Sequence, residues 1–341
     1  MLRRIAERHS AVLPIFHAER RKGAVFLPIC ISPELPAYQA LLHERIFVMS
    51  SDRAAHQDIR PLRILVLNIM PKKLETELQL LRLLSNAALQ VDISLLRMET
   101  HVSKNTAQSH LDAFYTTLPA IRFQYFDGMI ITGAPVEQLP FEEVDYWREI
   151  CELMAWSRTH VFSTLHICWG AQAGLYYHFG VPKYPLSQKM FGVFPHTAEI
   201  RHTLLLHGFD DVFYVPHSRH TEVRREDIEK VPELRIIASS EQAGVYLIAN
   251  RNGRQYFLTG HAEYDRNTLA QEYFRDKERN LPIDLPYHYF PDDDPTKPPE
   301  FSWRGHANLM YSNWLNYCVY QRTPYDLKTL QKTDWSQPAD I

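Results

Sequence analysis

The sequence predicts an α/β protein with a doubly wound, mostly parallel sheet flanked by helices. Apolar runs at residues 63–67 (RILVL), 128–132 (GMIIT) and from Val161 are typical of strands buried on both faces of a parallel sheet. Segments with helical character separate these runs along the chain. Ligands of such sheets bind at the carboxyl ends of the strands, so we expect a site in the loops that follow these runs.

The first half of the chain supplies most of the expected parallel sheet. Leucines at positions 74, 78, 81 and 84 fall on one face of a helix over residues 73–84. A helix-forming run at residues 171–177 follows the strand that begins at Val161. The other expected elements are helices at residues 37–45, 106–114 and 142–157, and strands at residues 46–49 and 91–96.

After Gly192 the chain is rich in short strand-like runs and ends in helices. The expected strands are residues 213–215, 234–238, 245–249 and 256–259, and the expected helices are residues 268–279 and 303–320. Proline and aspartate are dense at residues 281–300, which predicts a long surface loop. We expect residues 1–26 to be an extension outside the fold, residues 27–326 to form a single domain, and residues 327–341 to be a polar tail.

Composition excludes several classes of partner. The 341 residues carry a net charge of −3, which gives no electrostatic reason to expect nucleic acid or an anionic membrane surface. No apolar run reaches membrane-spanning length, and the N-terminal apolar piece is too short for a signal peptide. The four cysteines form no C-x-x-C pair, so we expect neither a disulfide framework nor a zinc knuckle, and we expect a reducing cytoplasm. Neither glycine-rich nucleotide-binding motif occurs.

Cys168 is the first candidate for chemistry. It stands at the sharp junction between the strand that begins at Val161 and the following helix, where α/β acyl-transfer enzymes hold a nucleophile. The free N–H groups and positive dipole of the helix start favour a thiolate and can receive an oxyanion. The competing interpretation is that Cys168 is a small buried hydrophobe, as many free cysteines are.

His261 and Glu263 are the candidate partners of Cys168. His261 follows a glycine at the end of an apolar strand, and in an extended segment Glu263 points to the same side. A carboxylate there can fix the tautomer of the imidazole and stabilise its charged form, as in a Cys-His-Glu triad. The seventeen histidines of the chain make any single one a weak candidate without such context.

Metal chemistry has little support in the sequence. The H-x-E of His261 and Glu263 also begins a zinc deaminase signature, but the P-C-x-x-C partner of that signature is missing. The pair His217 and His220 has no cysteine or carboxylate at a matching spacing. We therefore expect no metal.

Several longer stretches resemble one known family. They include FDGMIITGAPVE, STLHICWGAQAGLYYHFGVPK, QKMFGVFPH, VPHSR and TGHAEYDRNTLAQEYFRD, and the similarity extends from about residue 27 to residue 326. The sequence resembles the homoserine O-acyltransferases of methionine biosynthesis, a family that includes homoserine O-succinyltransferase and relatives that use acetyl-CoA. This resemblance implies a class I glutamine amidotransferase-like (flavodoxin-like) fold.

The resemblance also implies a ping-pong mechanism. Cys168 would take the acyl group from acyl-CoA as a thioester, and the hydroxyl of L-homoserine would then attack, with His261 removing its proton and Glu263 orienting His261. We expect the Trp169 N–H to be one oxyanion donor and the loop at Ile69 and Met70 to supply the other. The glutaminase elbow is usually G-x-C-x-G, but the first position here is His166, which weakens the case for a glutaminase.

Four further residues match positions of the family that bind substrate or select the donor. Lys189, Ser218 and Arg275 match substrate-site residues, and the Arg275 guanidinium could grip the homoserine carboxylate. In the family, a glycine at the position of Glu137 goes with succinyl-CoA and a glutamate with acetyl-CoA. A glutamate fills the space that the distal succinyl carboxylate needs and repels its charge.

The expected activity is therefore that of a homoserine O-acetyltransferase, with acetyl-CoA and L-homoserine as substrates and no cofactor. Homoserine O-succinyltransferase and serine O-acetyltransferase remain alternatives on the same site, because one methylene is poorly discriminated by packing. A glutaminase or another hydrolase could use the same triad, and a non-catalytic binding relative is a fourth alternative. A homodimer is an expectation from the family only.

Overall fold

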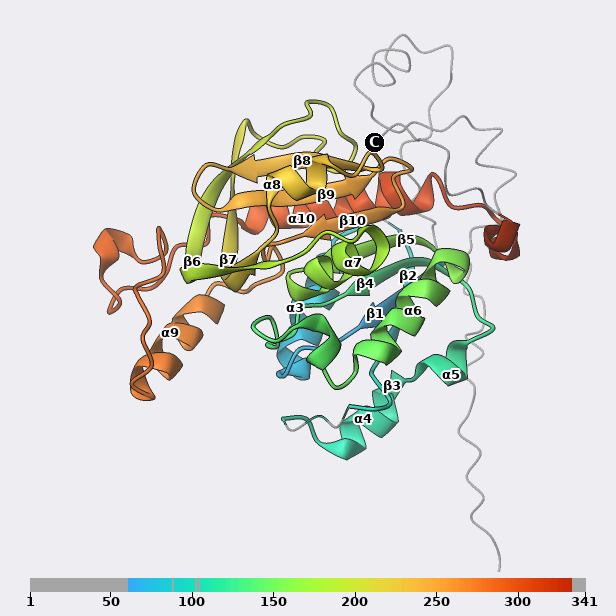
Figure 1. Ribbon diagram of the computed structural model, residues 1–341, viewed down its shortest axis with the longest axis horizontal. Helices are drawn as coiled ribbons and strands as arrows, with labels where there is room; N and C mark the ends of the chain where they lie inside the picture. The colour runs from blue at the N-terminus through green and yellow to red at the C-terminus, as the bar shows by residue number, and fades with distance from the viewer. Residues whose placement is uncertain (1–60, 88, 102, 104, 333–341) are drawn as a thin grey trace, which may run out of the picture. The chain divides into compact units, whose positions relative to one another are not determined.

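The computed structural model describes residues 61–332 except residues 88, 102 and 104, and these residues form a ten-stranded sheet (Figure 1). The strand order is β3-β2-β1-β4-β5-β10-β9-β8-β6-β7. The strands are β1 (Leu62–Leu67), β2 (Val91–Leu96), β3 (Tyr115–Thr116), β4 (Phe126–Ile131), β5 (Val161–Ile167), β6 (Tyr184–Ala198), β7 (Val212–Glu222), β8 (Leu234–Ser240), β9 (Gly244–Asn250) and β10 (Gln255–Leu258).

The sheet is parallel from β3 to β10 and antiparallel beyond it. Leu67 of β1 pairs with Ile131 of β4, which in turn pairs with His166 of β5, and β10 pairs in parallel with β5 through Leu258 and Ile167. The carboxyl ends of these strands therefore meet at one edge. The loops that follow β1, β4, β5 and β10 are brought together there, as the predicted fold class requires.

Helices cover both faces of the sheet, which confirms the doubly wound α/β prediction (Figure 1). On one face, α6 and α7 bury Ile150, Leu153 and Ala173 against the strands. On the other, α3 contacts α10, and Trp314 beyond α10 donates a hydrogen bond to Ser163 of β5. The helices are α3 (Lys73–Leu84), α4 (Gln108–Phe114), α5 (Leu118–Ile121), α6 (Trp147–His160), α7 (Trp169–Phe179), α8 (Arg225–Glu229), α9 (Thr268–Glu278) and α10 (Arg304–Asn313), with a π-helix η3 (Trp314–Tyr320) and 3₁₀ turns η1 (Phe141–Glu143), η2 (Pro291–Asp293) and η4 (Leu327–Lys332).

The long strand β6 is absent from the sequence prediction. It carries Pro185, Gly192 and Pro195, residues that usually interrupt strands, and its pairing with β7 shifts register between Pro185 and Met190. At Gly192 the backbone has φ 142°, and an added Cβ would lie 2.3 Å from the backbone nitrogen of Tyr287. Glycine is needed at position 192 because two backbones approach closely there, and this requirement leaves no periodic pattern of side chains in the sequence.

Three helix predictions differ from the structure. The helix expected over residues 142–157 begins at Trp147, after the turn η1, and the last helix changes to π geometry at Trp314. In α3, Leu74 and Leu78 are 54% and 57% exposed, so the leucine stripe does not form the buried face. Of the stripe only Leu84 is buried, together with Leu80 and Leu83, which lie outside the stripe. The leucine spacing predicted the helix correctly but did not predict which of its faces is buried.

Some sequence predictions fall outside the described residues: the extension at residues 1–26, the helix at residues 37–45 and the strand at residues 46–49. Of the predicted tail, Leu327–Lys332 is described and forms η4, with Leu330 buried next to α6. Within the described part of the chain, no helix is both long enough and apolar enough to cross a bilayer.

Candidate active site

Cys168 occupies a strained turn between β5 and α7. Its φ of 50° and ψ of −116° place a non-glycine residue in a rarely populated region of backbone space. The turn is held tightly to β4, because a Cβ added at Gly170 would lie 2.6 Å from the carbonyl oxygen of Thr132. This geometry confirms the predicted strand–turn–helix junction and places Cys168 immediately before the start of α7.

His261 lies next to Cys168. The backbone N–H of His261 donates to Pro216 O of β7 at 2.8 Å, which fixes the loop after β10. A Cβ added at Gly133 would lie 3.2 Å from Cys168 Cβ and 3.5 Å from His261 Cε1, so the two side chains face one small space. Cys168 is 5% exposed and His261 3% exposed. The candidate nucleophile and the candidate base are therefore buried neighbours.

Glu263 completes the arrangement. Its Oε1 lies 2.6 Å from His261 Nδ1, which fixes Nδ1 as the protonated nitrogen and leaves Nε2 as the ring nitrogen available to Cys168. Burial lowers the pKa of His261, but Cys168 and Glu263 outweigh burial and hold that pKa well above its ordinary value. The site therefore favours an imidazolium beside the sulfur.

The predicted oxyanion donors have different surroundings. Neither Trp169 N–H nor Gly133 N–H donates to any residue that the structure describes, and Gly133 faces Cys168 directly. Ile69 N–H already donates to Thr132 Oγ1 at 2.9 Å, and Met70 N–H to Asn68 Oδ1 at 3.2 Å. Gly133 is therefore a better placed second donor than the Ile69–Met70 loop, whose role stays a prediction.

Lys189 and Ser218 converge on a carboxylate that the sequence analysis missed. Ser218 Oγ donates to Glu272 Oε2 at 2.6 Å, and Lys189 Nζ lies 3.2 Å from the same oxygen. Tyr264 Oη donates to the other oxygen at 3.4 Å. Arg275 lies one turn further along α9, where its Nε donates to Asp276 at 2.7 Å. Three of these residues, but not Arg275, hold the Glu272 carboxylate at one place.

Glu137 lies in the loop after β4. Its Oε1 accepts a hydrogen bond of 2.9 Å from the backbone N–H of His220 on β7. Burial raises the pKa of Glu137, although the hydrogen bond and the charges of His220, His261 and Lys189 act in the opposite direction. The side chain is thus a half-buried carboxyl group close enough to His261 to sense its charge.

Arg219 and Lys73 are both buried cations. Arg219 is 2% exposed and donates to His217 Nδ1, Thr221 O and Ala243 O, but forms no ion pair with a described carboxylate. Burial lowers the pKa of Arg219, while the charge of Cys168 raises it. Lys73, at the start of α3, has a pKa lowered to about 8 by burial. Arg219 therefore adds positive charge to the surroundings of Cys168, whereas the Lys73 ammonium donates to the Asn68 carbonyl oxygen in the loop after β1.

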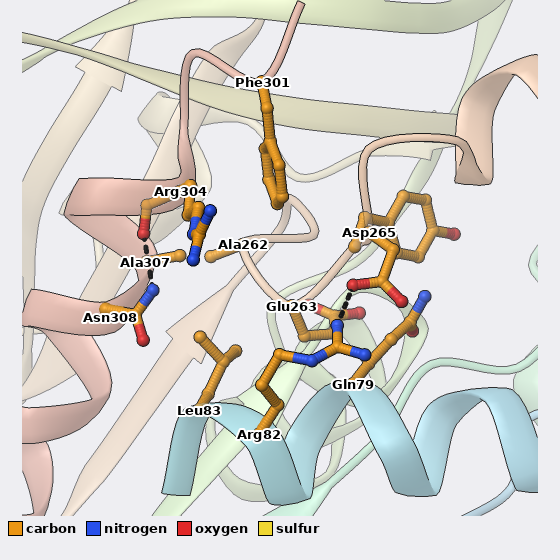
Figure 2. Close-up of a pocket in the computed structure, with 11 residues that line it drawn as sticks. Gln79, Arg82, Leu83, Ala262, Glu263, Asp265, Phe301, Arg304, Ala307 and Asn308 are labelled. Atoms are coloured by element: carbon orange, nitrogen blue, oxygen red, sulfur yellow. Dashed lines mark hydrogen bonds and ion pairs between the residues drawn. The ribbon is translucent and has the colours of Figure 1, made fainter. Parts of the chain in front are cut away.

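The loop that carries Glu263 is anchored from two sides. Arg82 of α3 forms an ion pair with Asp265 (Figure 2). Trp303, the residue before α10, donates to Tyr264 O at 2.9 Å. A cavity of about 240 Å³ lies between the loop and these helices, and its lining includes Glu263 but neither Cys168 nor His261. The anchoring contacts hold the carboxylate toward the imidazole.

No group of three or more histidine, cysteine, aspartate or glutamate side chains within the described ranges could hold a metal ion. His217, one half of the histidine pair considered from sequence, accepts a hydrogen bond from Arg219 and lies 3.2 Å from His196 Nε2. Its two ring nitrogens are thus engaged by protein groups.

The solved structures that resemble this chain support the fold. A glutamine amidotransferase from Thermotoga maritima superposes with a TM-score of 0.52 at 12% sequence identity, covering 76% of this chain and 99% of its own. A glutamine amidotransferase from Methylobacillus flagellatus has a TM-score of 0.50 at 10% identity, covering 79% of this chain and 99% of its own. These similarities confirm the class I glutamine amidotransferase-like fold and carry no statement about activity.

Sequence relatives are much closer. A homoserine O-acetyltransferase of Acetivibrio thermocellus is 61% identical over 305 residues, which is 89% of this chain and 100% of the relative. A protein of the same name from Geobacillus kaustophilus is 61% identical over 300 residues, or 88% of this chain and 99% of the relative. A family model described as homoserine O-succinyltransferase matches residues 28–325. The chain therefore belongs to the homoserine O-succinyltransferase family, as its resemblance predicted.

Proposed function

We propose that this protein is a homoserine O-acetyltransferase that carries the acetyl group as a thioester on Cys168. The observation that carries the proposal is the buried arrangement of Cys168, on the strained turn before α7, with His261 and Glu263, on the loop after β10. The two relatives with that name are 61% identical to this chain, and the alignments cover nearly their whole length. They support the same activity. Acetyl-CoA and L-homoserine are the substrates in this proposal.

In the first half-reaction, the Cys168 sulfur attacks the carbonyl carbon of acetyl-CoA. The developing oxyanion receives hydrogen bonds from the Trp169 and Gly133 N–H groups. The carbon–sulfur bond to CoA then breaks, and the His261 imidazolium gives its proton to the departing thiolate. The products are acetyl-Cys168, neutral His261 and free CoA, so atoms and charge balance.

In the second half-reaction, His261 accepts the proton of the homoserine hydroxyl as its oxygen attacks the thioester. Collapse of the tetrahedral intermediate releases O-acetylhomoserine and restores the sulfur beside the imidazolium. Glu263 holds the ring and stabilises its charged form. Glu272, held by Lys189 and Ser218, suits the ammonium group of the amino acid, and Arg275 suits its carboxylate.

Glu137 is the basis for choosing acetyl-CoA over succinyl-CoA. The Glu137 carboxyl is held by the His220 N–H and lies within the electrostatic reach of His261 and Lys189. A succinyl group would bring a second carboxylate into the same partly buried space, where repulsion is weakly screened. An acetyl group brings no charge and less volume.

A reducing compartment such as the cytoplasm suits this chemistry, because a thiol nucleophile must stay reduced. Cys151, Cys168 and Cys318 are all free thiols in the described part of the chain.

The proposal is tested by mixing the protein with acetyl-CoA in the absence of an acceptor and measuring its intact mass. We expect a gain of one acetyl group that L-homoserine discharges as O-acetylhomoserine. Cys168→Ala should abolish the gain, and the matched control Cys151→Ala should keep it. The absence of an acetyl adduct on the parent protein, or release of ammonia from glutamine in its place, would refute the proposal.

A further inference from the structure

Tyr264 connects the two halves of the site. Its ring stacks on the His261 imidazole, with ring centroids 4.1 Å apart and an angle of 14° between the planes. Its Oη donates to Glu272 Oε1 at 3.4 Å. The side chain is 5% exposed. One buried tyrosine therefore contacts both the group that moves the proton and the carboxylate of the acceptor side.

The backbone of Tyr264 is held independently of its ring. Trp303 Nε1 donates to Tyr264 O at 2.9 Å, and Tyr264 N–H donates to His261 O at 3.2 Å. Substitution of the side chain therefore leaves the anchoring of the loop in place. This separation makes the contribution of the side chain measurable.

We propose that Tyr264 is a positioning residue that aims Glu272 at the ammonium group of the acceptor and supports the charged imidazole of His261 during acetyl transfer. The inference rests on the proposed function and adds to it a residue that couples acceptor binding to proton transfer.

The hydrogen bonds of Glu272 support the first role. Its Oε2 accepts from Ser218 and is paired with Lys189, whereas Oε1 accepts only from Tyr264 among the residues described here. Oε1 therefore has the capacity to accept a further bond from the substrate. The Tyr264 hydroxyl fixes the direction in which that oxygen faces.

The stacking geometry supports the second role. When His261 takes the hydroxyl proton, its ring becomes a cation that lies over the negative face of the tyrosine ring. Glu263 stabilises the same cation through its hydrogen bond to Nδ1. Burial and the nearby carboxylate of Glu272 raise the pKa of Tyr264 well above its ordinary value, so the phenol stays neutral and remains a donor.

Two variants separate the roles. Tyr264→Phe keeps the ring and removes the hydroxyl, so we expect the KM for homoserine to rise about tenfold with kcat and the acetylation rate nearly unchanged. Tyr264→Leu also removes the ring that supports the charged His261, so we expect a lower kcat. The pKa of His261 should fall, and the acid limb of the pH–kcat profile should move to lower pH by about half a unit. Tyr264→Phe should leave that limb where it is.

Tyr246→Phe is the matched control, because Tyr246 is also buried but its Oη contacts Met310 Sδ at 3.6 Å. It should keep the parent KM and pH profile. If the parent protein forms no acetyl-Cys168, both the proposed function and this inference are wrong. If the parent turns over but Tyr264→Phe keeps the parent KM for homoserine, only the inference is wrong. That second result stands even if Tyr264→Leu does not fold.

Discussion

Ser218 donates a hydrogen bond of 2.6 Å to Glu272 and so joins strand β7 to helix α9. Lys189 of β6 reaches the same carboxylate oxygen at 3.2 Å. A carboxylate held by a cation and a hydroxyl is rigid, and it retains capacity to accept bonds from a second cation. That arrangement suits the recognition of an ammonium group.

We expect Glu272→Gln to raise the KM for homoserine by about 100-fold, because a hydrogen bond to a charged group is replaced by one to a neutral amide. Acetylation of Cys168 by acetyl-CoA should change little, since this half-reaction needs no acceptor. Single-turnover acetylation and steady-state kinetics with homoserine measure the two effects. Glu278→Gln, an exposed change on the same helix, is the control. An unchanged KM in Glu272→Gln would exclude the ammonium-binding role.

Glu137 variants should alter the choice of acyl donor. Glu137→Gln keeps the size of the side chain and removes the charge, whereas Glu137→Gly removes both. We expect the ratio of kcat/KM for succinyl-CoA to that for acetyl-CoA to rise about tenfold in the first variant and further in the second. Glu143→Gln, at an exposed position on the same loop, should keep the parent ratio. Equal ratios in all four proteins would show that Glu137 does not select the donor.

The donor ratio should also depend on pH. Because burial raises the pKa of Glu137, this carboxyl takes up a proton at a higher pH than an ordinary glutamate. Protonation removes its repulsion of a succinyl carboxylate, so the relative use of succinyl-CoA should increase as the pH falls through the raised pKa of Glu137. Measuring both donors across pH in the parent and in Glu137→Gln tests this, since the Gln variant should show a ratio that is independent of pH.

Much of the parallel half of the fold could be predicted from the sequence. The runs at residues 63–67 and 128–132 are mostly apolar because strands β1 and β4 have helices on both faces, and the structure confirms them as strands. Strand β6 could not be predicted in this way. Its prolines are tolerated by a shift in register, and Gly192 is required by the approach of Tyr287, neither of which leaves a periodic pattern.

Part of the candidate site could likewise be predicted from the sequence, and part could not. Cys168 and the His261–Glu263 pair follow strand ends, so topology alone brings them to one edge of the sheet. Glu272 was missed because its partners come from β6, β7 and the loop before α9, and their convergence depends on tertiary packing. Its one sequence signal is its position three residues before Arg275, on the same face of the helix. The choice between Gly133 and the Ile69–Met70 loop depends on hydrogen-bond partners that the sequence does not reveal.

Buried histidines should make the fold sensitive to acid. His166 is fully buried, and burial lowers its pKa to about 3 from an ordinary value of 6.5. Above pH 6.5 the ring is neutral in both the folded and unfolded chain, so it adds no pH dependence. Between pH 6.5 and about 3, only the unfolded chain binds the proton, so the free energy of unfolding falls as the pH falls. At pH 5 the loss from this residue is about 2 kcal/mol.

Denaturant titrations at several pH values test this in the parent and in His166→Met. The variant should show a slope of unfolding free energy against pH that is smaller by about 1.4 kcal/mol per pH unit near pH 5, whatever its overall stability. His196, with a pKa lowered to about 4 by burial, contributes in the same direction in both proteins and leaves the difference unaffected. Parallel slopes would show that His166 is protonated in the folded protein.

Gly133→Ala tests whether the space beside Cys168 is the oxyanion site. The added methyl would lie 3.2 Å from Cys168 Cβ, 3.5 Å from His261 Cε1 and 3.6 Å from Met70 Sδ, so it would crowd the place where the thioester oxygen meets the Gly133 N–H. We expect single-turnover acetylation to slow by about 100-fold, the usual effect of losing one oxyanion donor, with little change in thermal stability. Gly305→Ala at the start of α10 is the control, because its added methyl meets no atom within 4 Å. Acetylation of Gly133→Ala at the parent rate would move the oxyanion site away from Gly133 and restore the Ile69–Met70 loop as the candidate donor.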